Sequence, residues 1–232
     1  MNFDFSSLLK AQLFKDQFKA ELLLDLPNVE AHVRLAPKMR IDDIKTGRLP
    51  SHAVESAVLI LLYPHDSRLH TVVILRNEYD GAHSGQISLP GGKREESDTD
   101  FKYTALREAR EEIGIIPDKL EILGQLSPFY VRPSNFIVYP FVAFQPERPE
   151  FHPDATEVQR IIEIDLFHEI TYNKIENRTL TFKNNLQVDA PGFVVGNEFM
   201  WGATAMIFSE LIQVLNNVDN KLGKVLSSNP PG

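Results

Sequence analysis

The first part of the chain places apolar residues at helical spacing. Between Phe3 and Leu24, leucine and phenylalanine recur every few positions, with lysine, aspartate and glutamate between them. This pattern predicts an amphipathic helix that ends at Pro27. Segment 29–52 carries many charges and two prolines, which indicates a connecting arm. We therefore expect residues 1–50 to form an N-terminal helix and an arm.

The middle of the chain alternates between short β-type runs and turn residues. Residues 53–63 and 71–76 are aliphatic and β-branched, and the turn residues at 64–67 between them predict two paired strands. A helix is predicted over 101–113, because Gly114 follows it in the C-terminal capping position. Further strands are predicted at 120–126, 136–144, 159–164 and 180–182, and a last helix at 203–215, with Ile207, Leu211, Ile212 and Leu215 on one side.

Many short strands with a central and a terminal helix predict a mixed α/β (α+β) fold, in which a β-sheet packs between helices. We expect this domain to span residues 51–215. Residues 216–232 are expected to form a C-terminal tail, and its last six residues, Ser-Ser-Asn-Pro-Pro-Gly, are expected to be frayed.

Composition and charge narrow the classes of function. The chain has 232 residues, of which 43% are hydrophobic, so it can bury a substantial core. Its formal net charge of −8 argues against a nucleic-acid partner, because such binding needs a surplus of lysine and arginine. A small anionic ligand stays compatible with a few local bases and a bound cation. The absence of cysteine excludes disulfides, thiolate chemistry and sulfur-ligated zinc.

The sequence also bears on location. The N-terminal segment lacks a basic start followed by an apolar stretch, so a secretory signal is not expected. Acidic residues precede the first arginine, Arg34, which argues against a mitochondrial transit peptide. The longest apolar run, 57–63, is far shorter than a membrane helix. We expect a soluble cytoplasmic protein without a membrane partner.

The strongest chemical signal is a cluster of acidic residues within the predicted helix 101–113. Glu108, Glu111 and Glu112 stand at positions i, i+3 and i+4, which share one helix face. Three crowded carboxylates repel one another unless a cation lies among them, and hard oxygen ligands suit Mg²⁺ or Mn²⁺. Taken alone, the Glu-rich stretch is more typical of a solvated helix face.

The residues around this cluster favour the metal site. Gly91 and Gly92, just before the polar loop, allow the backbone to approach a metal or a phosphate, and Pro90 fixes the chain direction. The opposite side of the helix is an apolar stripe that can pack on a sheet, formed by Ala105, Leu106, Ala109 and Ile113.

Residues 91–115 resemble the signature of the Nudix family. Its general form is Gly, five residues, Glu, seven residues, then Arg-Glu-apolar-any-Glu-Glu-any-Gly-apolar. The second half is matched in full by residues 107–115. The first half departs, because Asp98 stands where the form has glutamate, and eight residues separate it from Arg107. The family's first glutamate commonly pairs with that arginine, so Asp98 is our expected partner of Arg107.

The resemblance implies a Nudix-type α/β/α sandwich and a set of roles. Glu108, Glu111 and Glu112 would be metal ligands together with the backbone carbonyl of Gly91, and Arg107 would orient the acidic cluster. The general base would be a glutamate of this helix or one from a later loop, and Glu157, in the acidic segment Pro-Asp-Ala-Thr-Glu-Val, is the candidate placed by resemblance. Glu157 could also be an ordinary solvated loop residue.

The flanking sequence resembles the coenzyme A pyrophosphatase branch of this family. The likeness covers most of residues 30–215, and it is carried most directly by Arg76, His83, Gly85, Ile87, Leu89, Pro90, Gly91 and Gly92. The branch usually has Leu-Arg where this chain has Asp80 and Gly81. The resemblance implies hydrolysis of the diphosphate bridge of coenzyme A, or of its thioesters, to 3′,5′-ADP and 4′-phosphopantetheine.

Several interpretations stay open at this point. Arg76, His83, Lys93 and Arg94 are candidate substrate contacts, although His83 could be a turn residue. Trp201 could pack the last helix onto the core or stack on adenine. A Nudix hydrolase of ADP-ribose or another nucleoside diphosphate derivative is an alternative, and a non-catalytic ligand sensor is a more distant one. The N-terminal helix could pack on its own domain or on a second subunit, which leaves a homodimer open.

Overall fold

The computed structural model describes residues 5, 7–78, 85–170, 174–182 and 185–228. Within these residues, eight strands form one mixed sheet with the order β3-β2-β1-β7-β5, while β4 pairs with β1, β6 with β7 and β8 with β2. The pairing of β1 with β7 is parallel, and the other pairings are antiparallel. The strands are β1 (Val54–His65), β2 (Arg68–Arg76), β3 (Ile87–Ser88), β4 (Gly91–Lys93), β5 (Glu121–Gln125), β6 (Phe129–Val131), β7 (Phe136–Phe144) and β8 (Val158–Asp165).

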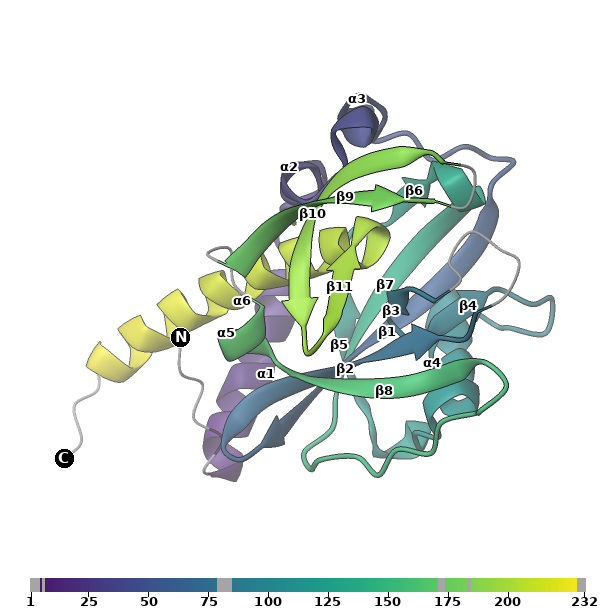
Figure 1. The fold of residues 1–232 in the computed structure, drawn as a ribbon. Coiled ribbons are helices and arrows are strands. Elements are labelled where there is room, and N and C mark those ends of the chain that lie inside the picture. Colours follow the sequence, from purple (N-terminus) through teal and green to yellow (C-terminus); the bar gives the residue numbers. More distant parts are fainter. Residues whose placement is uncertain (1–4, 6, 79–84, 171–173, 183–184, 229–232) are drawn as a thin grey trace.

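A smaller sheet and several helices surround this sheet (Figure 1). The three-stranded sheet has the order β11-β10-β9 and consists of β9 (Ile175–Thr181), β10 (Gln187–Val195) and β11 (Glu198–Trp201). The helices are α1 (Leu8–Leu22), α2 (Asn28–Arg34), α3 (Ile41–Lys45), α4 (Phe101–Ile113), α5 (Leu166–Glu169) and α6 (Gly202–Ser228), with 3₁₀ turns η1 (Lys38–Arg40), η2 (Pro117–Lys119) and η3 (Arg132–Ser134).

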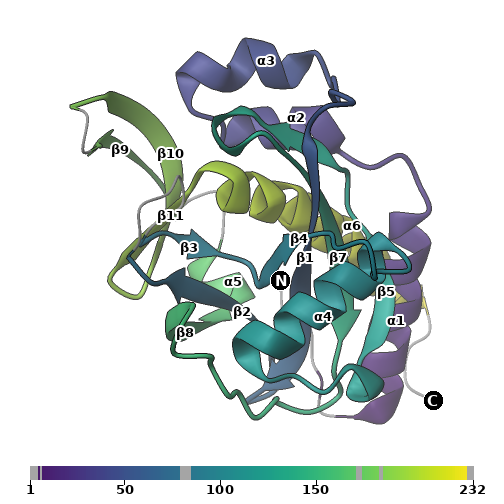
Figure 2. The same ribbon diagram turned by 90° about the vertical axis from the view of Figure 1, so that its right-hand side faces the viewer.

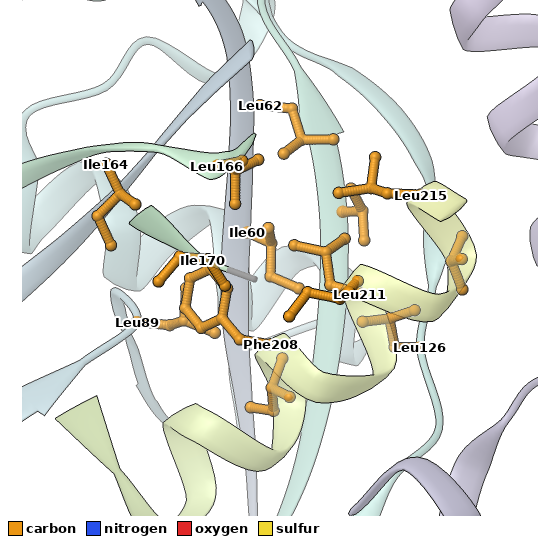
Figure 3. Packing of buried hydrophobic residues seen from close by; sticks show 14 of the residues in the cluster. Ile60, Leu62, Leu89, Leu126, Ile164, Leu166, Ile170, Phe208, Leu211 and Leu215 are labelled. Carbon is orange, nitrogen blue, oxygen red and sulfur yellow. The ribbon is translucent and has the colours of Figure 1, made fainter. Parts of the chain in front are cut away.

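Strand β1 is buried on both faces and divides the core into two layers. Its side chains alternate, so that Leu59 and Leu61 pack in the cluster below α4, while Ile60 and Leu62 pack in the cluster below α6. Figure 3 shows Ile60 and Leu62 among side chains of α6. Helices α4 and α6 therefore cover opposite faces of the sheet (Figure 2), which confirms the predicted sandwich of a mixed sheet between helices.

The β1–β2 hairpin shows how the sequence fixes a turn. Asp66 and Ser67 have φ values of 48° and 61°, and His65 pairs with Arg68 across a two-residue loop. Positive φ at both loop residues matches the right-handed twist of paired strands. The turn was predicted here, but the strands extend farther into the segment between them than the sequence pattern indicated.

Helix α1 packs on its own chain. Phe14 and Phe18 are buried, and Lys15 and Lys19 form ion pairs of 2.6 and 2.5 Å with Glu121 of β5. Glu21 binds Lys221 and accepts a hydrogen bond from Asn217, both in α6. These contacts place the N-terminal helix on the domain itself, the first of the two arrangements that the sequence left open.

The arm after α1 is more helical than predicted, because a buried carboxylate holds it. Glu210 of α6 is 0% exposed and accepts hydrogen bonds from the backbone N–H of Asn28 (3.1 Å), His32 Nε2 (3.0 Å), and the N–H and Oγ of Ser127 (3.2 and 2.6 Å). Segment 29–52 holds α2, η1 and α3. The sequence did not indicate these helices within the expected connecting arm, because they are short and fixed by tertiary contacts rather than by an apolar repeat.

The sequence pattern misplaced the end of one element and missed another in the C-terminal part of the chain. The last helix continues to Ser228 instead of ending at 215, so residues 216–228 of the expected tail are helical, while residues 229–232 lie outside the described residues. Val218 and Leu222 continue the row of buried apolar residues along α6. The asparagine and aspartate residues at 216–220 hide this repeat in the sequence. Strand β10 was missed because Pro191 and Gly192 interrupt it. A Cβ on Gly192 would lie 2.3 Å from the Met200 carbonyl oxygen, so glycine is required where β10 meets β11.

No helix in the described part of the chain combines the length and the apolar character that crossing a membrane requires.

Replacing Glu210 with alanine is expected to lower the free energy of unfolding by about 3–5 kcal/mol, because four donors would lose their acceptor in the core. Urea denaturation followed by circular dichroism measures this. Glu147→Ala, the same change at an exposed position, should alter stability by no more than about 0.5 kcal/mol. Equal effects of the two substitutions would contradict the role of the buried carboxylate.

Candidate active site

Helix α4 presents its acidic residues beside the sheet because both of its ends are fixed. The Asp100 side chain accepts a hydrogen bond from the Tyr103 N–H at the start, and Gly114 ends the helix with a φ of 73°. Ala105, Ala109 and Ile113 are fully buried against β1 and its neighbours. The predicted bounds of this helix and its glycine cap are confirmed.

The three glutamates of α4 differ in burial. The side chain of Glu112 is 1% exposed, that of Glu108 is 16% exposed and that of Glu111 is 51% exposed. The cluster therefore runs from the core to the surface along one helix face, which a purely solvated face would not do.

The glycine pair lets β4 pass between β1 and α4. A Cβ on Gly91 would lie 2.3 Å from the Ala57 carbonyl oxygen, and a Cβ on Gly92 would lie 2.5 Å from the Glu108 carboxyl carbon. Gly91 also has a φ of 152°, and its N–H donates to Glu112 Oε2 at 2.8 Å. Close approach of backbone and carboxylate at this point thus requires glycine.

Arg107 ties the acidic loop to the helix. Its guanidinium forms two parallel hydrogen bonds with Asp98, from Nε to Oδ1 (2.9 Å) and from Nη2 to Oδ2 (3.0 Å). The same side chain donates to Glu108 (3.0 Å) and Glu111 (3.1 Å), and to the carbonyl of Lys93 (3.1 Å). The expected pairing of Asp98 with Arg107 is confirmed.

Electrostatics at the buried end of the cluster favour an added cation. Burial raises the pKa of Glu112 to about 7, the negative charges of Glu108 and Glu157 add to that increase, and Arg76 and the Gly91 N–H oppose it. Burial also raises the pKa of Glu108, against the opposing charge of Arg107 and with Glu111 and Glu157 contributing to the increase. Negative charge at this point is therefore not fully compensated by the protein's own cations.

A cleft of about 640 Å³ lies beside the buried end of the cluster. It is lined by two short segments, and the lining residues are Arg76, Asn77, Glu78, Thr156, Glu157 and Gln159. Arg76 Nη1 lies 3.5 Å from Glu112 Oε1, so this arginine joins the cleft to the carboxylates. Asn77, Thr156 and Gln159 were not singled out from the sequence, since isolated polar residues at strand ends carry no signal of their own.

The remaining candidates lie in different places. The carbonyl of Lys93 accepts from Arg107, while its side chain is exposed. The Arg94 guanidinium lies 4.8 Å from the centre of the Phe101 ring and 3.5 Å from Glu55, and neither Lys93 nor Arg94 lines the 640 Å³ cleft. Trp201 makes an edge contact with Phe182 at 5.9 Å. His83 lies outside the described residues.

The donors near Glu112 fit a divalent metal ion. All are carboxylate or carbonyl oxygens, and Glu112 Oε1 is buried without a hydrogen-bond partner among the described residues. In their present positions no three acidic or histidine side chains of the described part converge as a complete ligand set. Glu108 and Glu111 each contact Arg107 through one carboxylate oxygen, and the other oxygen of each would be the one that holds the ion.

Comparison with known proteins agrees with this geometry. Residues 54–181 match the family described as NUDIX domain. The chain belongs to the Nudix family. It is similar to the Nudix hydrolase NudL of Yersinia enterocolitica, with 30% identity over 77% of this chain and 90% of the relative, which is described as uncharacterized.

Two Nudix relatives carry more specific names. The mitochondrial coenzyme A diphosphatase NUDT8 of Homo sapiens is 31% identical over 73% of this chain and 73% of its own length. The peroxisomal coenzyme A diphosphatase NUDT7 of Mus musculus is 32% identical over 56% of this chain and 54% of its own length. A solved MutT/nudix family protein from Enterococcus faecalis is 17% identical, with a TM-score of 0.49 over 77% of this chain and 69% of that one.

The family places the chain among enzymes. As a Nudix hydrolase it is a pyrophosphohydrolase, which cleaves a diphosphate anhydride in a small-molecule substrate, and Nudix hydrolases generally depend on a divalent cation.

Asp98→Ala is expected to destabilise the protein by about 3–5 kcal/mol at neutral pH, because it leaves Arg107 without its main partner. Arg107 holds the pKa of Asp98 well below its usual range. This stabilisation is therefore fully present above the unfolded-state pKa of about 4, and it is lost progressively as the pH falls from there toward the lower folded-state pKa. Urea titrations at several pH values should show the gap between the two proteins narrowing in acid. A change of the same size for Asp118→Ala, at an exposed position, would contradict this account.

In the presence of a chelator, we expect Glu112 to give the free energy of unfolding the opposite pH dependence. Its folded-state pKa of about 7 exceeds the unfolded value, so its contribution to stability is fully present below about pH 4.5 and is lost as the pH rises through about 7. The unfolding free energy should fall by roughly 2–3 kcal/mol between about pH 5 and 8 in the unchanged protein, and by much less in Glu112→Gln. Thermal unfolding in EDTA tests this. Parallel pH curves for the two proteins would show that Glu112 does not carry the effect.

Proposed function

We propose that this Nudix hydrolase cleaves the diphosphate bridge of coenzyme A, or of its thioesters, to 3′,5′-ADP and 4′-phosphopantetheine or its acyl derivative. The main support is the likeness to two relatives whose names describe coenzyme A diphosphatases, one of which is matched over 73% of this chain. The sequence from Arg76 to Gly92, which resembles the signature of that branch, supports the same substrate.

The residues of α4 and β4 would hold the cation. We propose Glu108, Glu111, Glu112 and the carbonyl of Gly91 as its ligands, and Mg²⁺ or Mn²⁺ as the ion, because all the donors are oxygen atoms. When bound, the ion neutralises charge on the diphosphate and acidifies water. Arg107 keeps Glu108 and Glu111 in place and so positions the ligand set rather than touching the substrate.

The cleft residues would position the diphosphate and the water. Arg76 lines the cleft beside Glu112, so its guanidinium can bind a phosphate there. Glu157 lines the same cleft and its charge raises the pKa of both Glu108 and Glu112, which supports its role as the general base. His83, Lys93 and Arg94 remain candidate substrate contacts on the grounds of sequence alone.

The reaction balances without a covalent enzyme intermediate. Glu157 takes a proton from a water molecule whose oxygen forms a bond to one phosphorus of the bridge. The bond from that phosphorus to the bridging oxygen breaks, and the bridging oxygen leaves with the other phosphate. Attack at either phosphorus yields the same two products. The work of the protein is positioning and charge stabilisation.

The remaining sequence predictions concern the setting of the enzyme. A cytoplasmic location, the absence of nucleic-acid and membrane partners, the division at residues 50 and 215, and the oligomeric state stay predictions. The substrate alternative is ADP-ribose or a related nucleoside diphosphate derivative, because Asp80 and Gly81 replace the Leu-Arg pair of the branch.

The substrate is tested by incubating the protein with Mg²⁺ or Mn²⁺ and, separately, with coenzyme A, ADP-ribose and diadenosine polyphosphates, and by identifying the products by mass. We expect 3′,5′-ADP and 4′-phosphopantetheine from coenzyme A. Glu111→Gln and Glu112→Gln should reduce turnover by about a hundredfold or more with the fold retained. Glu96→Gln, in the adjacent loop and without a role in the site, is the matched control. Cleavage of ADP-ribose but not of coenzyme A would refute the substrate, and near-normal activity of Glu111→Gln would refute its metal role.

A further inference from the structure

The proposed general base, Glu157, lies on an exposed loop, so contacts with other segments have to fix its position. The loop of residues 152–157 leads into β8, and Glu157 lines the 640 Å³ cleft. A general base acts only within hydrogen-bond reach of the water that it deprotonates, and a misplacement of about 1 Å can lower a rate by about a hundredfold. The hydrogen bonds that hold this loop therefore bear on the reaction.

The start of the loop is bonded to the end of helix α4. The last carbonyl groups of a helix have no partner within it, and two of them accept hydrogen bonds from the loop here. The Ile113 carbonyl accepts from the His152 N–H at 2.9 Å, and the Glu112 carbonyl accepts from the Asp154 N–H at 3.1 Å. Gly114 permits this approach, because a Cβ there would lie 2.6 Å from the Cβ of His152. The loop is thus attached to the same helix that carries the acidic cluster.

The end of the loop is bonded to Asn77, the first residue after β2. The backbone N–H of Asn77 donates to the Glu157 carbonyl at 3.0 Å, and its side-chain Nδ2 donates to the Ala155 carbonyl at 2.9 Å. The N–H of Glu157 donates to the Asp154 carbonyl at 3.1 Å. Both backbone groups of Glu157 therefore have partners, while the residue itself is exposed at the cleft.

The side chain of Asn77 makes a contact that the β2–β8 ladder does not provide. The pairing of these strands shifts register between Leu75 and Arg76, and it ends with Arg76 opposite Val158. The Ala155 carbonyl lies beyond this pair, and the short amide side chain of Asn77 reaches it. Alanine has no donor for this bond, and ionised aspartate only accepts. The position therefore calls for an amide.

We propose that Asn77 is a positioning residue for hydrolysis, whose side-chain amide holds the Glu157 loop against the end of β2 so that the Glu157 carboxylate faces the attacking water. This inference rests on the proposed role of Glu157 as the general base. The preceding residue, Arg76, is the proposed phosphate contact, so the end of β2 would set the places of the phosphate and the base together. Asn77 would act through Glu157 and not by touching the substrate.

Kinetics separate a positioning role from direct contact with the substrate. The values of kcat and KM are measured with Mg²⁺ or Mn²⁺ on whichever diphosphate the unchanged protein cleaves. Asn77→Ala should lower kcat by about tenfold or more and change KM by less than about twofold, because the base is displaced and the phosphate contact is kept. In Glu157→Gln, which has no base to position, adding Asn77→Ala should lower kcat by less than a further factor of about two. Asn177→Ala, the same change at an exposed position of β9, is the matched control and should leave kcat unchanged.

Hydrogen exchange followed by mass spectrometry tests the attachment of the loop without a substrate. In Asn77→Ala the amides of residues 154–158 should exchange at least about fivefold faster than in the unchanged protein, because the loop opens more often. The amides of α4 should exchange at the same rate in both proteins, which would show that the fold is retained.

Near-normal kcat in Asn77→Ala, unchanged exchange of the loop amides, or an equal loss of kcat with and without the Glu157 carboxylate would each overturn the positioning role. Failure of the proposed function gives different results. Cleavage of ADP-ribose but not of coenzyme A would refute the proposed substrate, and the comparison of variants would then be made on ADP-ribose. Near-normal kcat in Glu157→Gln would refute the general base and the role of Asn77 together.

Discussion

Confinement of negative charge at the buried side of α4 is the constraint around which this enzyme is arranged. Glu112 is buried because the apolar residues one turn away hold the helix on β1, and Glu108 meets the backbone at Gly92. Arg107 and Asp98 keep the loop and the helix together, but they leave one oxygen of Glu112 without a hydrogen-bond partner among the described residues. The buried charge that would bind a cation therefore lowers the stability of the metal-free protein. Such a cost in stability is common at functional sites.

The sequence predicted those features that depend on local chemistry. The α4 bounds, the Gly114 cap and the β1–β2 turn follow from spacing, capping and turn residues, and the pairing of Asp98 with Arg107 followed from the family pattern despite an altered loop. Sequence reasoning failed where a distant residue decides the structure. Helix α2 forms against Glu210, which is 182 residues from Asn28, and β10 tolerates Pro191 because its neighbours supply the pairing. The sequence pattern also did not predict the 640 Å³ cleft, because the two segments that line it, 76–78 and 156–159, come together only in the folded chain.

Two buried carboxylates of this protein illustrate different uses of the same group. The Glu210 carboxylate accepts hydrogen bonds at both of its oxygens and fixes the arm to α6. The Glu112 carboxylate accepts a hydrogen bond from the Gly91 N–H at one oxygen, and its other oxygen has no hydrogen-bond partner among the described residues. Satisfaction of hydrogen bonds thus separates an architectural carboxylate from a reactive one, although both are almost fully buried. The same criterion draws attention to His32, which has one nitrogen satisfied by Glu210 and the other unpartnered among the described residues.

The parallel pairing of β1 with β7 has a consequence for biosynthesis. Val54 is paired with Phe136, and the ladder continues to Leu62 and Phe144. During translation β1, which is apolar on both faces, emerges long before its partner, and the ladder closes only after a large loop has been made. Until then the edge of β1 that pairs with β7 is open to wrong partners, which makes β1 a segment where a nascent chain would need protection from aggregation.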